Sequence, residues 1–416
     1  MITRGITGRR AVTPRPGARE QRAMILSSLT NRIGNGLFNP AAALYFTRVV
    51  HLSARGVGLG LTLAGLVGLL AGVPAGRLAD RRGPRTVMLA TLAVQTLTML
   101  AFVLVRGWAV FTAVATLDLL ALSANNAARG ALIARVGGER PAAFRARLRS
   151  FVNLGVVIGT VGAGFAVQLD SRAAYTGLVL ANAASYLLCG LLLLRVPNYP
   201  PLPRPAERAR LGALRDRPFV TFAVLNGAMG LQYTVVSLVL PIWIAAHTHA
   251  PRWTVAAVAA LNSAVCVLLQ ARLGTRVETP DQGGAALRRA GLLFLVSCPL
   301  MAVAASVPAW AAVALLAVAI TVHSLGEIWE SSAGFALGFG LAPDHAQGQY
   351  QGLIGLGFDL GQAVGPALLT TLCLGLGRWG WYALGLCFAA LGAAGPAVAA
   401  WGARTRDGAA PQPAAA

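Results

Sequence analysis

Charged side chains are scarce in this chain. Of its 416 residues, 12% are charged and 56% are hydrophobic, and the mean hydropathy is +0.64. Soluble domains carry about 25% charged residues, so a soluble multidomain enzyme of this length would need far more polar surface. The composition therefore predicts a protein that crosses a membrane several times.

Lysine is absent, so all 35 basic residues are arginine, and the net charge is +21. A soluble protein this basic would suggest nucleic-acid binding. Here the arginines cluster in short segments between long apolar runs, which the orientation rule for membrane proteins explains better. We therefore expect no nucleic-acid partner.

Cysteine is uncommon, and the spacing of the cysteines argues against a disulfide-stabilised domain and against a zinc-binding domain. The five cysteines all lie inside apolar runs and form no C-x-x-C pair, which argues against a disulfide framework and a zinc site. The chain also has no G-x-x-x-x-G-K-[ST], so nothing indicates ATP as the driving force. We expect no cofactor, and we predict that the proton-motive force supplies the energy.

Twelve apolar runs are long enough to cross a bilayer, which needs roughly 20 residues. They lie at about 22–47, 55–75, 86–105, 108–133, 148–170, 173–195, 218–246, 253–271, 287–306, 309–335, 350–374 and 378–401. The longest polar segment between them, 196–217, is rich in Pro and Arg and separates six runs from six. We predict an all-α membrane protein with twelve transmembrane helices in two six-helix halves.

The predicted domain organisation follows from these runs. It consists of an N-terminal tail at 1–21, a six-helix bundle at 22–195, a linker at 196–217, a second six-helix bundle at 218–401 and a C-terminal tail at 402–416. With both tails and the linker in the cytoplasm, 27 arginines lie on the inner side and six on the outer side. We expect a multi-pass protein of the plasma (inner) membrane with both termini cytoplasmic.

The two halves share a weak internal sequence repeat. Gly155-x-x-x-Gly159 in the fifth run matches Gly357-x-x-x-Gly361 in the eleventh, at an offset of 202 residues. Six plus six spans around a basic linker is the arrangement of transporters built from repeated halves.

A short charged stretch, GRLADRRGPR at 76–85, lies between the second and third runs. It resembles the loop between helices two and three of the major facilitator superfamily, whose pattern is G-x-L-a-D-r-x-G-r-r, with Pro84 as a mild departure. The matching residues are Gly76, Leu78, Asp80, Arg81, Gly83 and Arg85. A plain Arg-rich turn would satisfy the orientation rule but would not explain Asp80 and both glycines.

The resemblance in topology covers residues 22–401 and implies a transporter, similar to the drug and metabolite efflux branch of bacterial members. In this family the matching Asp contacts the start of helix eleven and latches the cytoplasmic side shut. The fifth run, GVVIGTVGAG, partly resembles the glycine-rich motif of the family's proton-coupled antiporters. It departs from that motif at Thr160, where the motif has Pro.

Three polar residues in the tenth run share one helix face, because His323, Glu327 and Glu330 are spaced i, i+4, i+7. A charged group at mid-bilayer costs at least ~2.5–3.5 kcal/mol if it faces lipid. We therefore expect this face to line a water-filled substrate and proton pathway. Two carboxylates three residues apart do not both ionise easily there, so one should hold a proton, and Glu327 is the predicted proton or cation site.

Other spans contribute polar residues to the same predicted pathway. They are Asn31, Arg32 and Asn35 in the first run, Asp118, Asn125 and Arg129 in the fourth, and Asp359 in the eleventh, with a weaker contribution from Asn226, Gln232 and Tyr233 in the seventh. The resemblance implies that helices one, four, seven and ten line a central cavity, and the stripes lie on these helices. A structural alternative remains open, in which Arg32 pairs with an acid, His323 bonds to a carbonyl, and Asp359, in the glycine-rich eleventh run, partners a basic residue instead of a substrate. A metal site at His323 and Glu327 would lack a third ligand at a sensible spacing.

Three functions fit these observations. The first is proton-coupled efflux of a small organic molecule by alternating access; the second is import or symport by the same fold. The third is a membrane enzyme that uses the polar face of the tenth run, but an enzyme would keep its polar cluster at one membrane interface. Polar stripes occur in both halves, so we predict a transporter and not an enzyme, a monomer whose partners are its substrate and the lipid bilayer.

Overall fold

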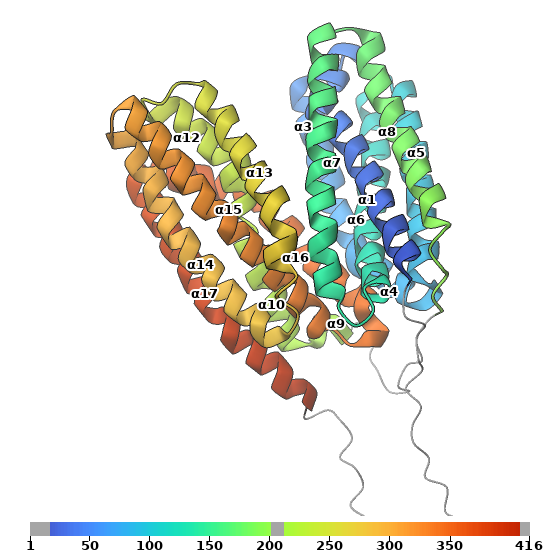
Figure 1. Cartoon of the computed structure of the whole chain (residues 1–416). Helices are drawn as coiled ribbons and strands as arrows, with labels where there is room; N and C mark the ends of the chain where they lie inside the picture. The colour runs from blue at the N-terminus through green and yellow to red at the C-terminus, as the bar shows by residue number, and fades with distance from the viewer. Residues whose placement is uncertain (1–16, 201–211, 408–416) are drawn as a thin grey trace, which may run out of the picture.

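The computed structural model describes residues 17–200 and 212–407, and every regular element in these ranges is helical. Most of the predicted tails and half of the predicted linker, 1–16, 201–211 and 408–416, lie outside the described residues. The helices form two bundles that stand side by side (Figure 1). The prediction of an all-α membrane fold in two halves is confirmed.

The first bundle contains the helices before residue 200. They are α1 (Ala18–Phe38), continued to Val49 by η1 (Asn39–Ala41), α2 (Ala42–Leu44) and η2 (Tyr45–Val49); α3 (Ala54–Gly68), η3 (Leu69–Ala71) and α4 (Gly72–Arg82); α5 (Pro84–Leu104); α6 (Trp108–Val136); α7 (Pro141–Leu169); and α8 (Arg172–Leu193).

The second bundle contains the helices after residue 211. They are α9 (Gly212–Arg215); α10 (Arg217–Met229), α11 (Gln232–Thr234), η4 (Val235–Val239) and α12 (Leu240–His247); α13 (Trp253–Gly274); α14 (Pro280–Val303) with η5 (Ala304–Ser306); α15 (Ala309–Gly340); η6 (Asp344–Ala346), α16 (Gln347–Leu369) and η7 (Thr370–Gly375); and α17 (Arg378–Asp407).

Eleven helical segments within the described ranges are long and apolar enough to cross a membrane. The segment 18–49 is as long but more polar, because it carries Arg32 and three asparagines, and with it the described chain matches the twelve predicted spans. The outer surface of the bundles is apolar: Leu104 and Trp310 are both 78% exposed. A soluble protein rarely exposes such side chains together, so this surface suits lipid.

Several helices extend past the apolar runs that predicted them. Helix α7 begins at Pro141, where the apolar run begins at 148, and α17 ends at Asp407, where the run ends at 401. Helix α1 begins at Ala18, inside the predicted tail. Hydropathy detects only the lipid-facing part of a helix, so polar turns that continue the same helix escape it.

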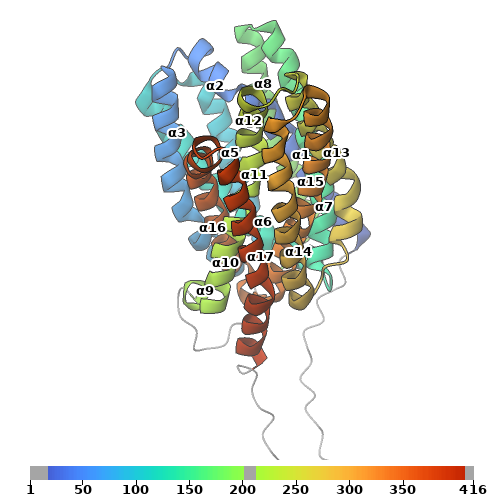
Figure 2. The same ribbon diagram turned by 90° about the vertical axis from the view of Figure 1, so that its left-hand side faces the viewer.

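The two bundles converge at one end of the molecule and diverge toward the other (Figure 1). At the converged end α16 packs against α4 and α6, and α13 packs against α7. The start of α1 and the end of α17 lie at this same end, as the perpendicular view in Figure 2 also shows.

The glycine motif that is repeated in the two halves lies at equivalent helix contacts. A Cβ on Gly155 in α7 would lie 2.9 Å from the Leu29 carbonyl oxygen of α1, and one on Gly357 in α16 would lie 2.5 Å from the Ala223 carbonyl oxygen of α10. In both halves a glycine lets the fifth span approach the backbone of the first span closely. The repeat detected in the sequence therefore has a structural counterpart.

Candidate functional site

Two pairs of glycines join the bundles where α4 crosses α16. Gly72 and Gly76 of α4 face Gly348 and Gly352 of α16, and a Cβ on any of the four would press on the facing backbone. Small residues four apart on both helices allow this close backbone approach. The crossing therefore brings Asp80, one turn beyond Gly76, against the N-terminus of α16.

Asp80 binds the start of α16 with both carboxylate oxygens. Its Oδ1 accepts from the backbone N–H of Gly348 at 2.8 Å, and its Oδ2 accepts from that of Gln349 at 3.0 Å. The first N–H groups of a helix have no intrahelical partner and carry a partial positive charge, so a carboxylate is well matched to them. This contact links the two bundles and is the one that the family resemblance implied for Asp80.

Gly83 and Arg85 shape the charged stretch within the first bundle. Gly83 has φ +91°, in the left-handed region that favours glycine, and this conformation makes the tight turn between α4 and α5. Arg85 donates to the Leu194 carbonyl oxygen at 3.2 Å, and Arg81 is exposed at the end of α4. Asp80 and Gly76 thus join this stretch to the second bundle.

A cavity of about 370 Å³ lies between the bundles beside this crossing. Residues of α1, α4, α6 and α7 line one wall, and residues of α10, α11, α15 and α16 line the other. Six charged residues line it: Arg32, Arg129, Arg145, Arg149, Glu330 and Asp359. Four of these, Arg32, Arg129, Glu330 and Asp359, were predicted pathway residues.

Other predicted pathway residues lie away from the cavity, in contacts within the first bundle. Asp118 accepts from the Thr98 hydroxyl at 2.7 Å, and Asn125 donates to the Thr91 hydroxyl at 2.8 Å; both contacts join α6 to α5. The neighbouring Asn126 lines the cavity instead. The predicted shared face of Asp118, Asn125 and Arg129 therefore divides between a helix contact and the cavity.

The asparagines of α1 are also absent from the cavity lining. Asn35 accepts from the Tyr186 hydroxyl at 2.8 Å and donates to the Asn31 side-chain oxygen at 3.4 Å. The Tyr186 bond joins α1 to α8, while Arg32, the residue after Asn31, lines the cavity.

His323 is buried and makes the contacts of a structural residue. Its Nδ1 lies 3.1 Å from the Ser297 hydroxyl, and its Nε2 lies 3.2 Å from the Gln232 side-chain oxygen. The ring packs against Phe294 with centroids 4.7 Å apart. No group of three His, Cys, Asp or Glu side chains within residues 17–200 and 212–407 is arranged to hold a metal ion.

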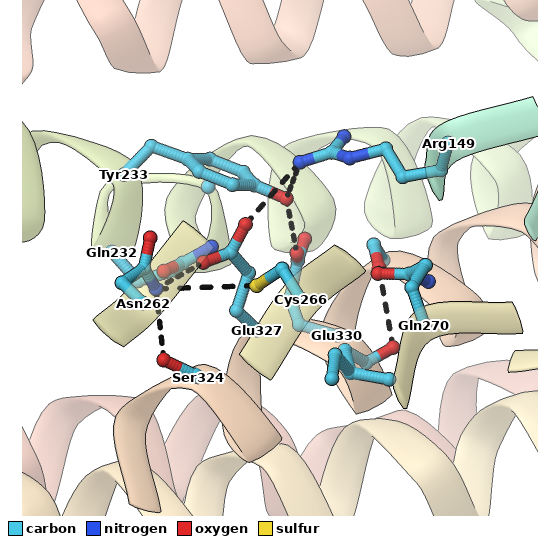
Figure 3. Close-up of polar contacts among 12 residues, drawn as sticks. Arg149, Gln232, Tyr233, Asn262, Cys266, Gln270, Ser324, Glu327 and Glu330 are labelled. Carbon is cyan, nitrogen blue, oxygen red and sulfur yellow. Dashed lines mark hydrogen bonds and ion pairs between the residues drawn. The ribbon is translucent and has the colours of Figure 1, made fainter. Parts of the chain in front are cut away.

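Glu327 forms an ion pair with a residue of the other bundle. Its Oε1 lies 3.4 Å from Nη2 of Arg149 in α7, and its Oε2 accepts from the Asn262 amide at 3.1 Å. The same guanidinium donates to the Tyr233 hydroxyl at 2.9 Å, and that hydroxyl donates to Glu330 at 3.2 Å (Figure 3). Arg149, Tyr233 and the two glutamates thus form one connected network across the space between the bundles.

Sequence analysis did not place Arg145 and Arg149 in the pathway, because it counted both among the arginines of the inner side. Both belong to α7, four residues apart on one face, and both line the cavity. Arg145 donates to the Gln351 side-chain oxygen at 2.7 Å and lies over the Phe335 ring at 5.0 Å. Pro141, which occupies the first helical position, was the available signal that the helix begins before the apolar run.

Comparison with known proteins shows which family this architecture is similar to. The sequence pattern of the Major Facilitator Superfamily matches residues 24–366. An uncharacterized MFS-type transporter of Bacillus subtilis, YqjV, is 28% identical over 200 residues, 48% of each chain. A Deinococcus radiodurans protein provisionally named as a sugar efflux transporter is 33% identical over 191 residues, 44% of this chain and 47% of that one. The chain thus spans about half the length of the curated relatives it matches.

Solved structures share the fold. A bacterial homologue of the iron transporter ferroportin, in an outward-facing state, aligns with a TM-score of 0.73 at 15% identity over 92% of this chain and 99% of that one. The Escherichia coli fucose:proton symporter aligns with a TM-score of 0.67 at 13% identity over 92% and 98% of the two chains. The two bundles, the Asp80 contact and the extent of the sequence match lead to one conclusion: the chain belongs to the Major Facilitator Superfamily, whose members are transporters and not enzymes.

Proposed function

We propose that this protein is a secondary active transporter that expels a small organic molecule across the plasma membrane in exchange for protons. The observation that carries the proposal is the Arg149–Glu327 ion pair, which joins the two bundles beside the cavity. Alternating access requires the bundles to separate at one end and approach at the other. An ion pair across them therefore couples the charge of Glu327 to the conformation.

The chemistry of this ion pair determines which conformation is favoured when Glu327 is protonated. A proton on Glu327 neutralises it and removes its attraction to Arg149, which favours separation of the bundles at the converged end. Tyr233 and Glu330 connect the ion pair to the cavity wall by hydrogen bonds, so a proton that enters the cavity has a route to Glu327. With both termini cytoplasmic, the converged end is the inner one, and an outer proton then promotes inward opening.

Outward transport has support from the name of one relative, the sugar efflux transporter of Deinococcus radiodurans, over the half of the chain that it covers. Import coupled to protons would use the same groups with the substrate loaded on the outer side. Efflux by proton exchange and import by proton symport are distinguished by the direction of the pH gradient that drives substrate accumulation in vesicles.

The test uses the full chain in proteoliposomes, with a panel of sugars and small organic acids and an imposed pH gradient. In Glu327→Gln, gradient-driven accumulation should vanish while exchange of labelled substrate at equal pH survives. Glu278→Gln is the matched control, because Glu278 also pairs with an arginine of the other bundle, Arg140, but at an exposed position outside the cavity. That control should keep its coupling.

Two results would contradict the assignment. If Glu327→Gln still concentrates substrate against a gradient, Glu327 is structural and the coupling group must be sought at Asp359 or Asp118. If both glutamine variants lose coupling equally, any ion pair between the bundles suffices and the buried network has no special part in it.

A further inference from the structure

The charges of the cavity are divided between its two walls. All four arginines belong to the first bundle: Arg32 on α1, Arg129 on α6, and Arg145 and Arg149 on α7. Both acids, Glu330 on α15 and Asp359 on α16, belong to the second bundle. The lining therefore carries two more positive than negative groups, and the excess lies on one side.

Two of the arginines already have protein partners. Arg149 is bound by Glu327 and Tyr233, and Arg145 donates to Gln351 and lies against an aromatic ring. Glu327 therefore compensates the charge of Arg149, and Gln351 and the ring fix the orientation of the Arg145 guanidinium group.

Arg32 and Arg129 differ, because no hydrogen bond or ion pair joins their guanidinium groups to any residue in the described ranges. The Nε of Arg32 is buried without an acceptor. Both groups line the same wall of one cavity, together with Arg145 and Arg149, so like charges gather there. Unpaired ionisable groups inside the membrane are costly and mark substrate or ion pathways.

The opposite wall offers apolar surface. Phe335 and Phe358 line it together with Ile354, and Tyr233 and Phe358 pack with ring centroids 5.7 Å apart. A cavity of about 370 Å³ lies at the small end of the usual range for ligand sites, about 300–1,000 Å³. The site thus combines a small volume, an aromatic side and a cationic side.

We propose that the substrate is a small organic anion whose carboxylate or phosphate group is bound by Arg32 and Arg129, with its uncharged body against the aromatic wall. Guanidinium groups match both kinds of oxyanion in planar, two-pronged geometry. The assignment names the substrate class of the transport proposed above and rests on it. A neutral sugar would leave both guanidinium groups without a counter-charge.

Binding is tested on the full chain purified in detergent, by the ligand-induced rise in melting temperature at millimolar concentrations. The probes form matched sets: benzoate and phenyl phosphate against benzyl alcohol, and glucuronate against glucose. Anions should stabilise the wild-type protein, and their neutral counterparts should not. The relative effect of benzoate and phenyl phosphate identifies which oxyanion the pair prefers.

The variants are Arg32→Gln and Arg129→Gln, with Arg129→Lys to retain the charge should the glutamine variant fail to fold. Loss of one charge-assisted interaction should weaken anion binding about 10- to 100-fold. Arg129→Lys should bind with intermediate affinity, because it keeps the charge and loses the two-pronged geometry. Arg147→Gln is the control, since Arg147 is exposed on α7 and does not line the cavity; it should bind anions normally.

The proposal is overturned if neutral probes stabilise the protein as well as anions do, if no anion stabilises it, or if anion binding survives in both glutamine variants. Electrical recordings on proteoliposomes separate this result from the transport proposal. Saturable transport of neutral probes alone would leave transport intact and refute the anion site. Anion binding without any transport would support the site and refute the transport.

Discussion

Replacement of Asp80 by Asn should release the contact between the bundles at the converged end. The carboxylate accepts two backbone N–H groups of α16, at 2.8 and 3.0 Å. Asn keeps one acceptor oxygen and presents an N–H₂ group to the second donor, so about one hydrogen bond to a charged acceptor is lost, together with the charge that favours the helix N-terminus. Such a bond is worth about 1.5–3 kcal/mol.

That free energy sets the expected shift in population. A loss of ~2 kcal/mol changes the ratio of closed to open forms at this end about 30-fold. A protein that is mostly closed would then show a substantial open population. Transport should fall, because a transporter that does not hold this end shut cannot complete the cycle, while insertion into the membrane should be unaffected.

The conformational shift can be measured without knowledge of the substrate. Spin labels at Arg82→Cys and Thr405→Cys, both exposed near the converged end of different bundles, report the separation by pulsed electron resonance. Cys387 is the exposed native cysteine and is replaced by Ser, since the other four are buried. Asp80→Asn should add a population at longer distance.

Asp281→Asn provides the matched control. Asp281 is an exposed acid in the first turn of α14. Its replacement by Asn removes the same charge from a helix N-terminus, but at a place away from the contact between α4 and α16. Its distance distribution should equal that of the wild type. An unchanged distribution in Asp80→Asn, with normal transport, would refute the role of Asp80 as a latch.

Three further outcomes are expected. Gly352→Val should also shift the labels apart, because even a Cβ at this position collides with the Gly72 backbone; an unaltered distance would show that α4 and α16 do not close in solution as described. A reporter fused at Ala416, or one inserted in the 196–217 linker, should read as cytoplasmic, and a periplasmic signal from either would overturn the twelve-span topology. Arg48→Gln should lower the melting temperature by no more than a few degrees, since its ion pair with Asp170 is half exposed; a drop like that of a core substitution would contradict this.

The pattern of apolar runs was sufficient to predict the helices and their division into halves, because a span must be both long and apolar to cross a bilayer. The charged turn at 76–85 was likewise recognisable, since a short local motif specifies both the turn and its acid. The resemblance implied that Asp80 contacts the start of the eleventh helix, but the sequence did not show that Gly348 and Gly352 of α16 face Gly72 and Gly76 of α4. That depends on which helices become neighbours across the two bundles.

Tertiary structure alone decided which polar residues share the cavity. Helical spacing places Asp118, Asn125 and Arg129 near one face, but a face is wide enough to contact α5 on one side and the cavity on the other, so Asp118 and Arg129 separate. His323 and Glu327 likewise share a stripe, yet one is enclosed by its own bundle and the other meets Arg149 of the opposite bundle. Arg145 lies in a polar turn of α7 that precedes the apolar run, and Arg149 lies at the start of that run, so neither position predicted a place in the cavity. Periodicity determines the direction in which a side chain points, whereas the packing of the partner helices determines what it meets there.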